Sequence, residues 1–352
     1  MTTTASNNSS ADLIKRIEAE LTAYTRLGSE AISPKNLIDK WQELVGSEPK
    51  RFINEDRTVN VPALKNFRRD QIFVPDWPER EMNRPNFRNF IGGQRRGHRR
   101  VLNEALEVLE ENGCQDLLQK YPCHPAGNPY VYRRHGFSYT FRWSKHIYSL
   151  NLFNKIMAEK LGEGFLSLDI GSSYGIFPSL LKREHPTSHH ILVDFPEQLI
   201  LAYYFLGTCI PGATIAGVKE IMEQKTLDRD FFMQYDFCLL PYSLYQDIVP
   251  GTLDMVSNFA SLGEMSRDWF NYYIKSPTFT TAKYFFTANR IQSYPGYDTD
   301  LKIVDYPVWD ADKTFHFGIS PVFSNVYMYQ RKNLFFNERV GYPPYFEYIG
   351  EI

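Results

Sequence analysis

The stretch Leu168-Asp169-Ile170-Gly171-Ser172-Ser173-Tyr174-Gly175 decides the fold, because it reads as a buried strand that turns sharply into a helix. Gly171 permits a tight turn, and Gly175 lets the backbone approach a ligand or the following helix closely. Ser172 and Ser173 are small enough to leave the rim of the turn open. In an open α/β sheet, ligands bind beyond the carboxyl ends of the strands, which is where this turn falls.

Short apolar runs around this turn predict the strands of one sheet: Phe165–Ile170, Ile191–Asp194, Asp236–Leu240, Leu253–Val256 and Lys283–Thr287. Helical stretches separate most of them, notably Gln198–Leu206 and Ser266–Ile274. This alternation predicts an α/β fold with a doubly wound, mainly parallel, Rossmann-like sheet. Phe315–Phe317 and Val326–Arg331 have no long helix between them, which predicts an antiparallel pair at the C-terminal edge.

The first 160 residues show helical and loop patterns without a run of strands. Helical spacing predicts helices over Ala11–Leu27, Ser33–Leu44, His98–Leu118 and Phe141–Leu161, whereas residues 46–88 read as irregular. We therefore expect three parts: a disordered polar tail at 1–10, a mainly helical N-terminal substrate and lid domain at 11–160, and a cofactor-binding domain at 161–352.

Composition excludes several classes of partner. The net charge of −2 over 352 residues gives no global attraction for nucleic acid or an anionic membrane. The polar N-terminus is no secretory signal, and no apolar run is long enough to cross a bilayer, so we expect a cytoplasmic protein. We expect no metal, because neither an HxxxH motif nor clustered acids occur. The cysteines form no CxxC pair and read as reduced thiols: Cys114, Cys123, Cys209 and Cys238.

One dense basic run, at residues 94–100, has two interpretations. It could contact a phosphate of a sugar nucleotide or a nucleic acid. The alternative, which the slightly acidic chain favours, is a solvated helix start paired with acidic residues further along: Glu104, Glu107, Glu110 and Glu111.

Asp194 ends the strand that follows the glycine turn. It lies close to the offset of about 20 residues at which an acidic side chain meets ribose hydroxyls. A carboxylate accepts two hydrogen bonds from a vicinal diol, so this position suits an adenosine. Asp194 could instead cap the helix that Pro196 and Glu197 begin, or do both.

NAD is the competing nucleotide, but its fingerprint requires glycines where Ser173 and Ile176 stand. A bulky isoleucine where helix and strand must pack tightly argues against NAD. Asp169, two residues before the first glycine, suits a cofactor with a charged amino-acid part, because it can hold an ammonium through water.

At these positions the sequence resembles class I S-adenosylmethionine-dependent methyltransferases, over about residues 165–330. More narrowly, it is similar to the family of sugar O-methyltransferases. The narrower resemblance lies in Gly127-Asn128-Pro129, Gly136 with Arg142, Val193–Pro196, Asn258–Ser261 and Gly263–Met265. One departure is Ser173, where many class I enzymes have a glycine.

The resemblance implies S-adenosyl-L-methionine as the cofactor and a set of residues that hold it. Asp169, Gly171 and Gly175 form the first cofactor motif, with Ser172, Ser173 and Tyr174 between them. Asp194, followed by Phe195, is the expected ribose contact. Leu240 and Pro241 would border the adenine, and Asn258, Phe259 and Ser261 would face the sulfonium.

Three residues are catalytic candidates. Glu264 could cap the following helix, accept a substrate hydroxyl hydrogen bond or act as a base. His146 lies on the helix just before the cofactor domain and could reach over the cofactor, and His316 lies near the closing strands. A lone histidine is more often a surface or hydrogen-bonded structural residue than a catalyst.

The acceptor is expected to meet Arg142, one helical turn before His146 on the same face, and the aromatic side chains of Tyr139 and Trp143. Such aromatics could stack on a sugar or an aromatic ring.

Three functions fit these patterns. The first is a small-molecule O-methyltransferase acting on a sugar or polyol hydroxyl. The second is a C- or N-methyltransferase acting on an aromatic natural product. The third is a non-catalytic adenosine-binding protein that kept the fold. The expected partner is a small-molecule acceptor, and a homodimer is compatible with the sequence.

Overall fold

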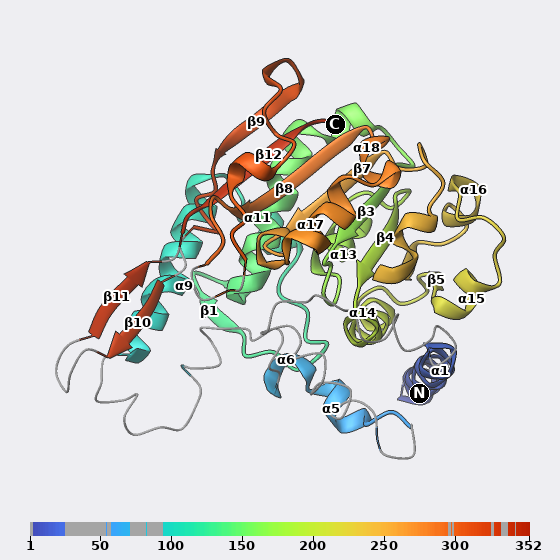
Figure 1. Ribbon diagram of the computed structural model, residues 1–352. Helices are drawn as coiled ribbons and strands as arrows, with labels where there is room; N and C mark the ends of the chain where they lie inside the picture. The colour runs from blue at the N-terminus through green and yellow to red at the C-terminus, as the bar shows by residue number, and fades with distance from the viewer. Residues whose placement is uncertain are drawn as a thin grey trace.

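An eight-stranded mixed sheet forms the centre of the computed structural model, with the strand order β5-β6-β4-β3-β7-β8-β12-β9 (Figure 1). The structure describes residues 3–24, 54, 58–70, 82, 94–294, 297, 299–324, 327–331, 337–341 and 343–352. The strands are β3 (Leu166–Ile170), β4 (His189–Asp194), β5 (Ile215–Ala216), β6 (Phe237–Pro241), β7 (Met255–Phe259), β8 (Tyr284–Arg290), β9 (Thr314–Ile319) and β12 (Tyr345–Glu351).

The strands from β5 to β8 in this order run parallel, and β12 runs antiparallel to both β8 and β9. The chain passes from β3 to β4 on one side, and later returns to β7 on the other side of β3. This reversal makes the carboxyl end of β3 the topological switch point, where such sheets bind ligands. The Rossmann-like α/β fold with an antiparallel C-terminal edge is thus confirmed.

Two hydrophobic cores cover the two faces of the sheet, because side chains alternate along each strand. On one face pack α11 (Phe141–Ile156), α13 (Ile176–Glu184) and α14 (Pro196–Cys209), against sheet residues that include Leu192 and Phe286. On the other face pack α16 (Arg229–Phe232), α17 (Arg267–Ile274) and α18 (Pro277–Thr280), against residues such as Leu168 and Val256. The strands are therefore buried on both sides, which explains their continuous apolar runs.

The remaining helices surround these layers. They are α1 (Thr3–Tyr24), α5 (Val61–Lys65), α6 (Phe67–Asp70), α9 (Gln94–Glu111), α10 (Gln115–Lys120), α12 (Ala158–Leu161) and α15 (Val218–Met222). In Figure 1, α1 lies beside α14 and α15, which it contacts. Among the described helices, none combines the length and apolar character that a bilayer crossing requires.

The antiparallel edge differs from the predicted pair. β9 pairs with β12 and not with β10 (Tyr327–Arg331), which forms a separate hairpin with β11 (Asn337–Gly341) beside α9 (Figure 1). β12 itself was not predicted. Its side chains are buried along almost the whole strand because Ile349 packs in the core on one face of the sheet, and Phe346 and Tyr348 pack in the core on the other face. The strand therefore lacks the alternation typical of an edge strand.

The N-terminal part departs from the predicted helices at several points. The helix expected over His98–Leu118 is divided into α9 and α10, because Gly113 adopts a left-handed φ of 72° and ends α9. Helix α1 begins at Thr3, within the expected tail, since extending a nucleated helix costs little. The helices α5 and α6 lie within 46–88, and a hairpin of β1 (Tyr132–Arg134) and β2 (Phe137–Tyr139) precedes α11. The predicted helix Ser33–Leu44 lies outside the described residues.

Asp254 links the amino ends of three central strands, β3, β7 and β8. It is 6% exposed, accepts a hydrogen bond from the Leu166 amide at 2.9 Å, and forms ion pairs with Arg229 and Lys283, both at 2.7 Å. Burial acts to raise the pKa of this carboxyl, but the hydrogen bonds from Lys283 and Leu166 outweigh burial and hold the pKa below its ordinary value.

We expect Asp254→Ala to lower the free energy of unfolding by about 1–3 kcal/mol near neutral pH, because the buried Leu166 amide loses its acceptor. Since the folded-state pKa is lowered, this stabilisation is present above the unfolded pKa and is lost as pH falls through the folded value. Urea unfolding at neutral and acidic pH measures the difference. Lys283→Ala is the control, and should cost less than about 1 kcal/mol because the lysine is exposed. Equal stability of Asp254→Ala and wild type near neutral pH would contradict the prediction.

Candidate functional site

The turn after β3 places several small residues at the switch point. Gly171, Ser173 and Gly175 all have left-handed φ angles, of 67°, 52° and 81°. A side chain at Gly171 would collide with Ser261, so the turn needs glycine there. The Ser172 hydroxyl is buried, and in the described part of the chain it has no hydrogen-bond partner. An unpartnered buried hydroxyl beside a bare backbone turn is the arrangement expected where a polar ligand binds.

Asp194 closes this turn from the neighbouring strand. One carboxylate oxygen accepts the Ser173 amide at 2.6 Å, and the other accepts the Phe195 amide at 2.7 Å. Burial raises the pKa of Asp194 to about 6, against these two hydrogen bonds and the nearby Arg142, which lower it. The predicted helix-cap role is wrong: Phe195 is the N-cap of α14, and no side chain caps that helix. Each carboxylate oxygen has a second lone pair with which to accept a ligand hydroxyl.

Asp169 is the second-last residue of β3, just before the turn. Its carboxylate is 6% exposed and accepts a hydrogen bond of 2.7 Å from the Ser257 hydroxyl on β7. Burial, together with the nearby Asp194 carboxylate, raises the pKa of Asp169 to about 7, against the Ser257 hydrogen bond, which lowers it. Two acidic groups in this position favour a ligand that brings a positive charge.

Asn258 and Ser261 support the turn from β7. The Asn258 amide nitrogen donates to the Ile170 carbonyl and to the Ser261 hydroxyl, both at 2.6 Å, and its oxygen accepts from Asn289 at 2.7 Å. Asn258 is fully buried, so its side chain positions the end of β3 and has no free face toward a sulfonium.

Other expected cofactor residues divide between the rim and the core. Pro241, at the end of β6, pairs with Asp194, and the Phe195 ring packs edge-on against Tyr242 at 5.6 Å. The side chains of Tyr174 and Leu240 are fully buried in hydrophobic cores, so the expectation that they contact the cofactor is corrected for their side chains. The Arg142 guanidinium lies 5.9 Å from the centre of the Tyr174 ring.

Helix α11 brings two predicted residues to the same edge of the sheet. A guanidinium nitrogen of Arg142 donates to the Ser173 hydroxyl at 3.4 Å. The His146 ring packs edge-on against Phe259 at 5.7 Å, and its buried Nδ1 has no partner among the described residues. Burial and the neighbouring cations Arg142 and Lys145 lower the pKa of His146 well below its ordinary value, so the imidazole stays neutral at physiological pH.

Glu264 lies at the end of a short 3-10 helix (Leu262–Glu264) after β7. Its Oε1 forms an ion pair with Arg290 at 3.3 Å and accepts the Tyr297 hydroxyl at 3.1 Å. It does not cap α17, because Ser266 has that role. Asp194, Phe259, Arg142, His146 and Glu264 thus all lie along the carboxyl edge of the sheet.

Three predicted site residues lie elsewhere. The Tyr139 hydroxyl donates to the Leu102 carbonyl and the Trp143 indole to the Tyr121 carbonyl, both at 2.9 Å, and both side chains are fully buried. These aromatics therefore hold the N-terminal core together and do not line an acceptor site. His316 lies in mid-strand on β9, bonded to Glu347 at 2.9 Å. It is four strands from β3, which is roughly 19 Å at the usual strand spacing, so it is not beside the turn.

Lys145 and Arg290 also lie at the carboxyl edge, and neither was predicted from the sequence. Lys145 lies between Arg142 and His146 in the chain, and Arg290 is the last residue of β8. Lys145 could have been found, because it lies between the predicted site residues Arg142 and His146 on the same expected helix.

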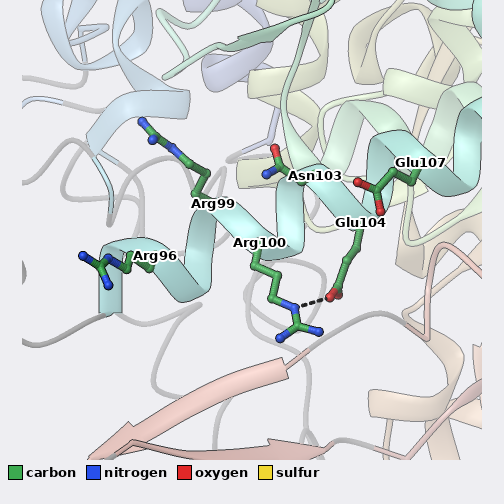
Figure 2. A pocket seen from close by; sticks show the side chains of 6 residues that line it. All are labelled: Arg96, Arg99, Arg100, Asn103, Glu104 and Glu107. Carbon is green, nitrogen blue, oxygen red and sulfur yellow. Dashed lines mark hydrogen bonds and ion pairs between the residues drawn. The ribbon is translucent and has the colours of Figure 1, made fainter. Parts of the chain in front are cut away.

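The basic run lies at the start of α9 (Figure 2). Arg96, Arg99 and Arg100 line a hollow with Asn103, Glu104 and Glu107, but their guanidinium groups point in different directions. Arg100 forms an ion pair with Glu104 at 2.6 Å and is largely exposed. This arrangement agrees with a solvated, self-paired helix start.

No protein-family model and no curated protein matches this chain. Among solved structures, it is similar to magnesium protoporphyrin IX methyltransferase (ChlM) from Synechocystis PCC 6803 with bound SAH, at 10% identity and a TM-score of 0.36, over 60% of this chain and 83% of that one. It is also similar to TehB from Haemophilus influenzae, at 10% identity and a TM-score of 0.35, over 57% and 60% of the two chains. These likenesses concern the fold alone, so a function has to be inferred from the residues of the site.

Proposed function

We propose that this protein is an S-adenosylmethionine-dependent methyltransferase whose cofactor lies across the turn Gly171–Gly175. The observation that carries the proposal is the Asp194 carboxylate, held by two backbone amides beside a bare glycine turn at the switch point. A ribose diol fits the remaining lone pairs of Asp194. Asp169 suits the ammonium of the methionine part, and the Ser172 hydroxyl, which has no partner in the described part of the chain, offers a further polar contact.

Arg142 then has a role at the cofactor and not at the acceptor. Its guanidinium lies against Ser173, next to the site proposed for the methionine part. The carboxylate of that part needs a cation, and arginine binds carboxylates with paired hydrogen bonds. With Asp169 for the ammonium and Arg142 for the carboxylate, the amino acid is recognised at both charged groups.

The acceptor site is proposed along the carboxyl edge beyond β7 and β8, between Phe259, His146 and Glu264. A cofactor held by Asp169, Arg142 and Asp194 would supply an electrophilic methyl group for transfer to an acceptor oxygen. The chain aligns the acceptor and excludes water. Neutral His146, whose Nδ1 has no partner among the residues that the structure describes, is positioned to accept a hydrogen bond from the acceptor hydroxyl, while Arg290 and Tyr297 hold Glu264 in place.

A sugar or polyol hydroxyl is the acceptor that these groups favour. Glu264, Arg290 and Tyr297 provide hydrogen-bonding groups along this edge, whereas the predicted aromatic residues Tyr139 and Trp143 are buried in the core. This distribution disfavours a flat aromatic acceptor. Methyl transfer from S-adenosylmethionine labelled on its methyl group tests the choice, with sugars, sugar acids and sugar phosphates in one set and phenols and indoles in the other. Labelling of the aromatic set alone would overturn the hydroxyl assignment, and labelling of neither set together with absent cofactor binding would overturn the methyltransferase.

Arg142→Gln is expected to weaken binding of S-adenosylhomocysteine by roughly 10-fold, because a charge-assisted hydrogen bond to its carboxylate is lost. Binding of 5′-methylthioadenosine should be unchanged, since that molecule has the adenosine but no amino-acid carboxylate. Titration calorimetry of both ligands makes the comparison. An equal loss for the two ligands would show that Arg142 shapes the turn and does not bind the carboxylate.

A further inference from the structure

Lys145 lies at the carboxyl edge, and its ammonium faces aromatic rings. It lies one turn after Arg142 on α11, and its ammonium lies over three aromatic rings: Phe141 at 4.7 Å, Phe323 at 5.0 Å and Tyr345 at 5.8 Å. The side chain is half-buried. In the part of the chain that the structure describes, the Lys145 ammonium has neither a hydrogen bond nor a carboxylate within ion-pair distance, whereas the backbone carbonyl of Lys145 accepts the Ser149 hydroxyl.

The charges around Lys145 are unbalanced. Arg142 on its own helix and Arg290 on β8 are cations that lower its pKa, and Glu264 is the carboxylate that acts against them. Glu264 already forms an ion pair with Arg290 at 3.3 Å. Partly burying a further ammonium without a counter-ion is unfavourable, and ring faces compensate only in part.

We propose that Lys145, together with Arg290, binds the carboxylate or phosphate of the acceptor, so that the methylated molecule is an acidic sugar or polyol. This inference rests on the proposed function and specifies its substrate. The Tyr345 and Phe323 rings, which lie beside the ammonium, would contact the sugar ring. Arg142, which lies toward Ser173, stays with the cofactor carboxylate.

The binding of such an anion is coupled to the protonation of Lys145. Burial, followed by the nearby Arg142 and Arg290, lowers the pKa of Lys145 to about 7. An anion favours the protonated amine, so it raises this pKa, and the affinity for the anion falls as pH rises through about 7. A rise of one pKa unit corresponds to a 10-fold preference of the anion for the protonated form.

Acetylation of the Lys145 amine by limiting acetic anhydride tests the proposal, because only the neutral amine reacts. The reaction is run near pH 7 on the full chain and followed by peptide mass spectrometry, with sodium sulfate, sodium acetate or sodium chloride at equal ionic strength. Sulfate represents a phosphate group and acetate a carboxylate. We expect sulfate, acetate or both to slow acetylation of Lys145 several-fold relative to chloride, and the stronger of the two identifies the acidic group.

Lys160 is the matched control, because its ammonium also lies over a ring, that of Phe315 at 4.1 Å, but on α12 outside the site. Its acetylation should not respond to either anion. In calorimetry with the stronger probe, Lys145→Gln should lose binding, whereas Lys145→Arg should retain it without the decline above pH 7. If neither anion slows acetylation of Lys145 more than that of Lys160, the proposal is overturned. Binding of S-adenosylhomocysteine, measured in parallel, reports separately on the proposed function.

Discussion

Replacing Asp194 with alanine should weaken the binding of S-adenosylhomocysteine by roughly 10- to 100-fold, because the ribose diol loses a charged acceptor. The same loss should occur with 5′-methylthioadenosine, which shares the ribose. The wild-type affinity should also weaken as pH falls below about 6, since the protonated Asp194 carboxyl accepts hydrogen bonds less well. Titration calorimetry measures each of these effects.

Asp228→Ala is the matched control for this substitution. Asp228 also accepts a backbone amide, that of Phe231 at 3.0 Å, but it caps α16 near the amino ends of the strands. Its loss should lower the melting temperature without changing the affinity for S-adenosylhomocysteine. Equal affinities of Asp194→Ala and wild type would remove the ribose assignment.

Replacing Gly171 with alanine should lower the free energy of unfolding by about 2–5 kcal/mol. A left-handed backbone costs a residue with a Cβ roughly 1–2 kcal/mol, and overpacking costs typically 1–3 kcal/mol more. The added methyl would meet the side chain of Ser261, which is itself bonded to Asn258. Urea unfolding measures the loss.

A second substitution separates the two costs. Ser261→Gly in the Gly171→Ala background removes the side chain that the new methyl meets. The double variant should therefore regain the free energy of unfolding that overpacking removed, but not the part that the left-handed backbone removed. Additive losses in the double variant would mean that Gly171 and Ser261 do not approach each other in solution.

The turn and Asp194 were predictable because their signals are local. A short apolar strand, two glycines and an acidic residue at the end of the next strand are all visible within about 25 residues. The strand order and the antiparallel edge were less accessible, since β12 acquires its place only by pairing with β8 and β9. For the same reason the sequence does not indicate that His316 lies four strand positions away from β3.

The acceptor side of the site shows more clearly which contacts a single sequence does not predict. Tyr139 and Trp143 have the composition of pocket residues, but whether an aromatic side chain faces a ligand or the core depends on packing from distant segments. Lys145 illustrates the converse, because two of the rings around it, those of Phe323 and Tyr345, come from 178 and 200 residues further along the chain. A single sequence carries no signal for contacts of this kind.

Titration calorimetry of the wild-type chain with S-adenosylhomocysteine and with NADH tests the central claim most directly. Asp169, Arg142 and Asp194 together predict that S-adenosylhomocysteine binds at one site per chain and that NADH does not compete for it. Binding of NADH in its place, or no binding of S-adenosylhomocysteine at all, would contradict the account.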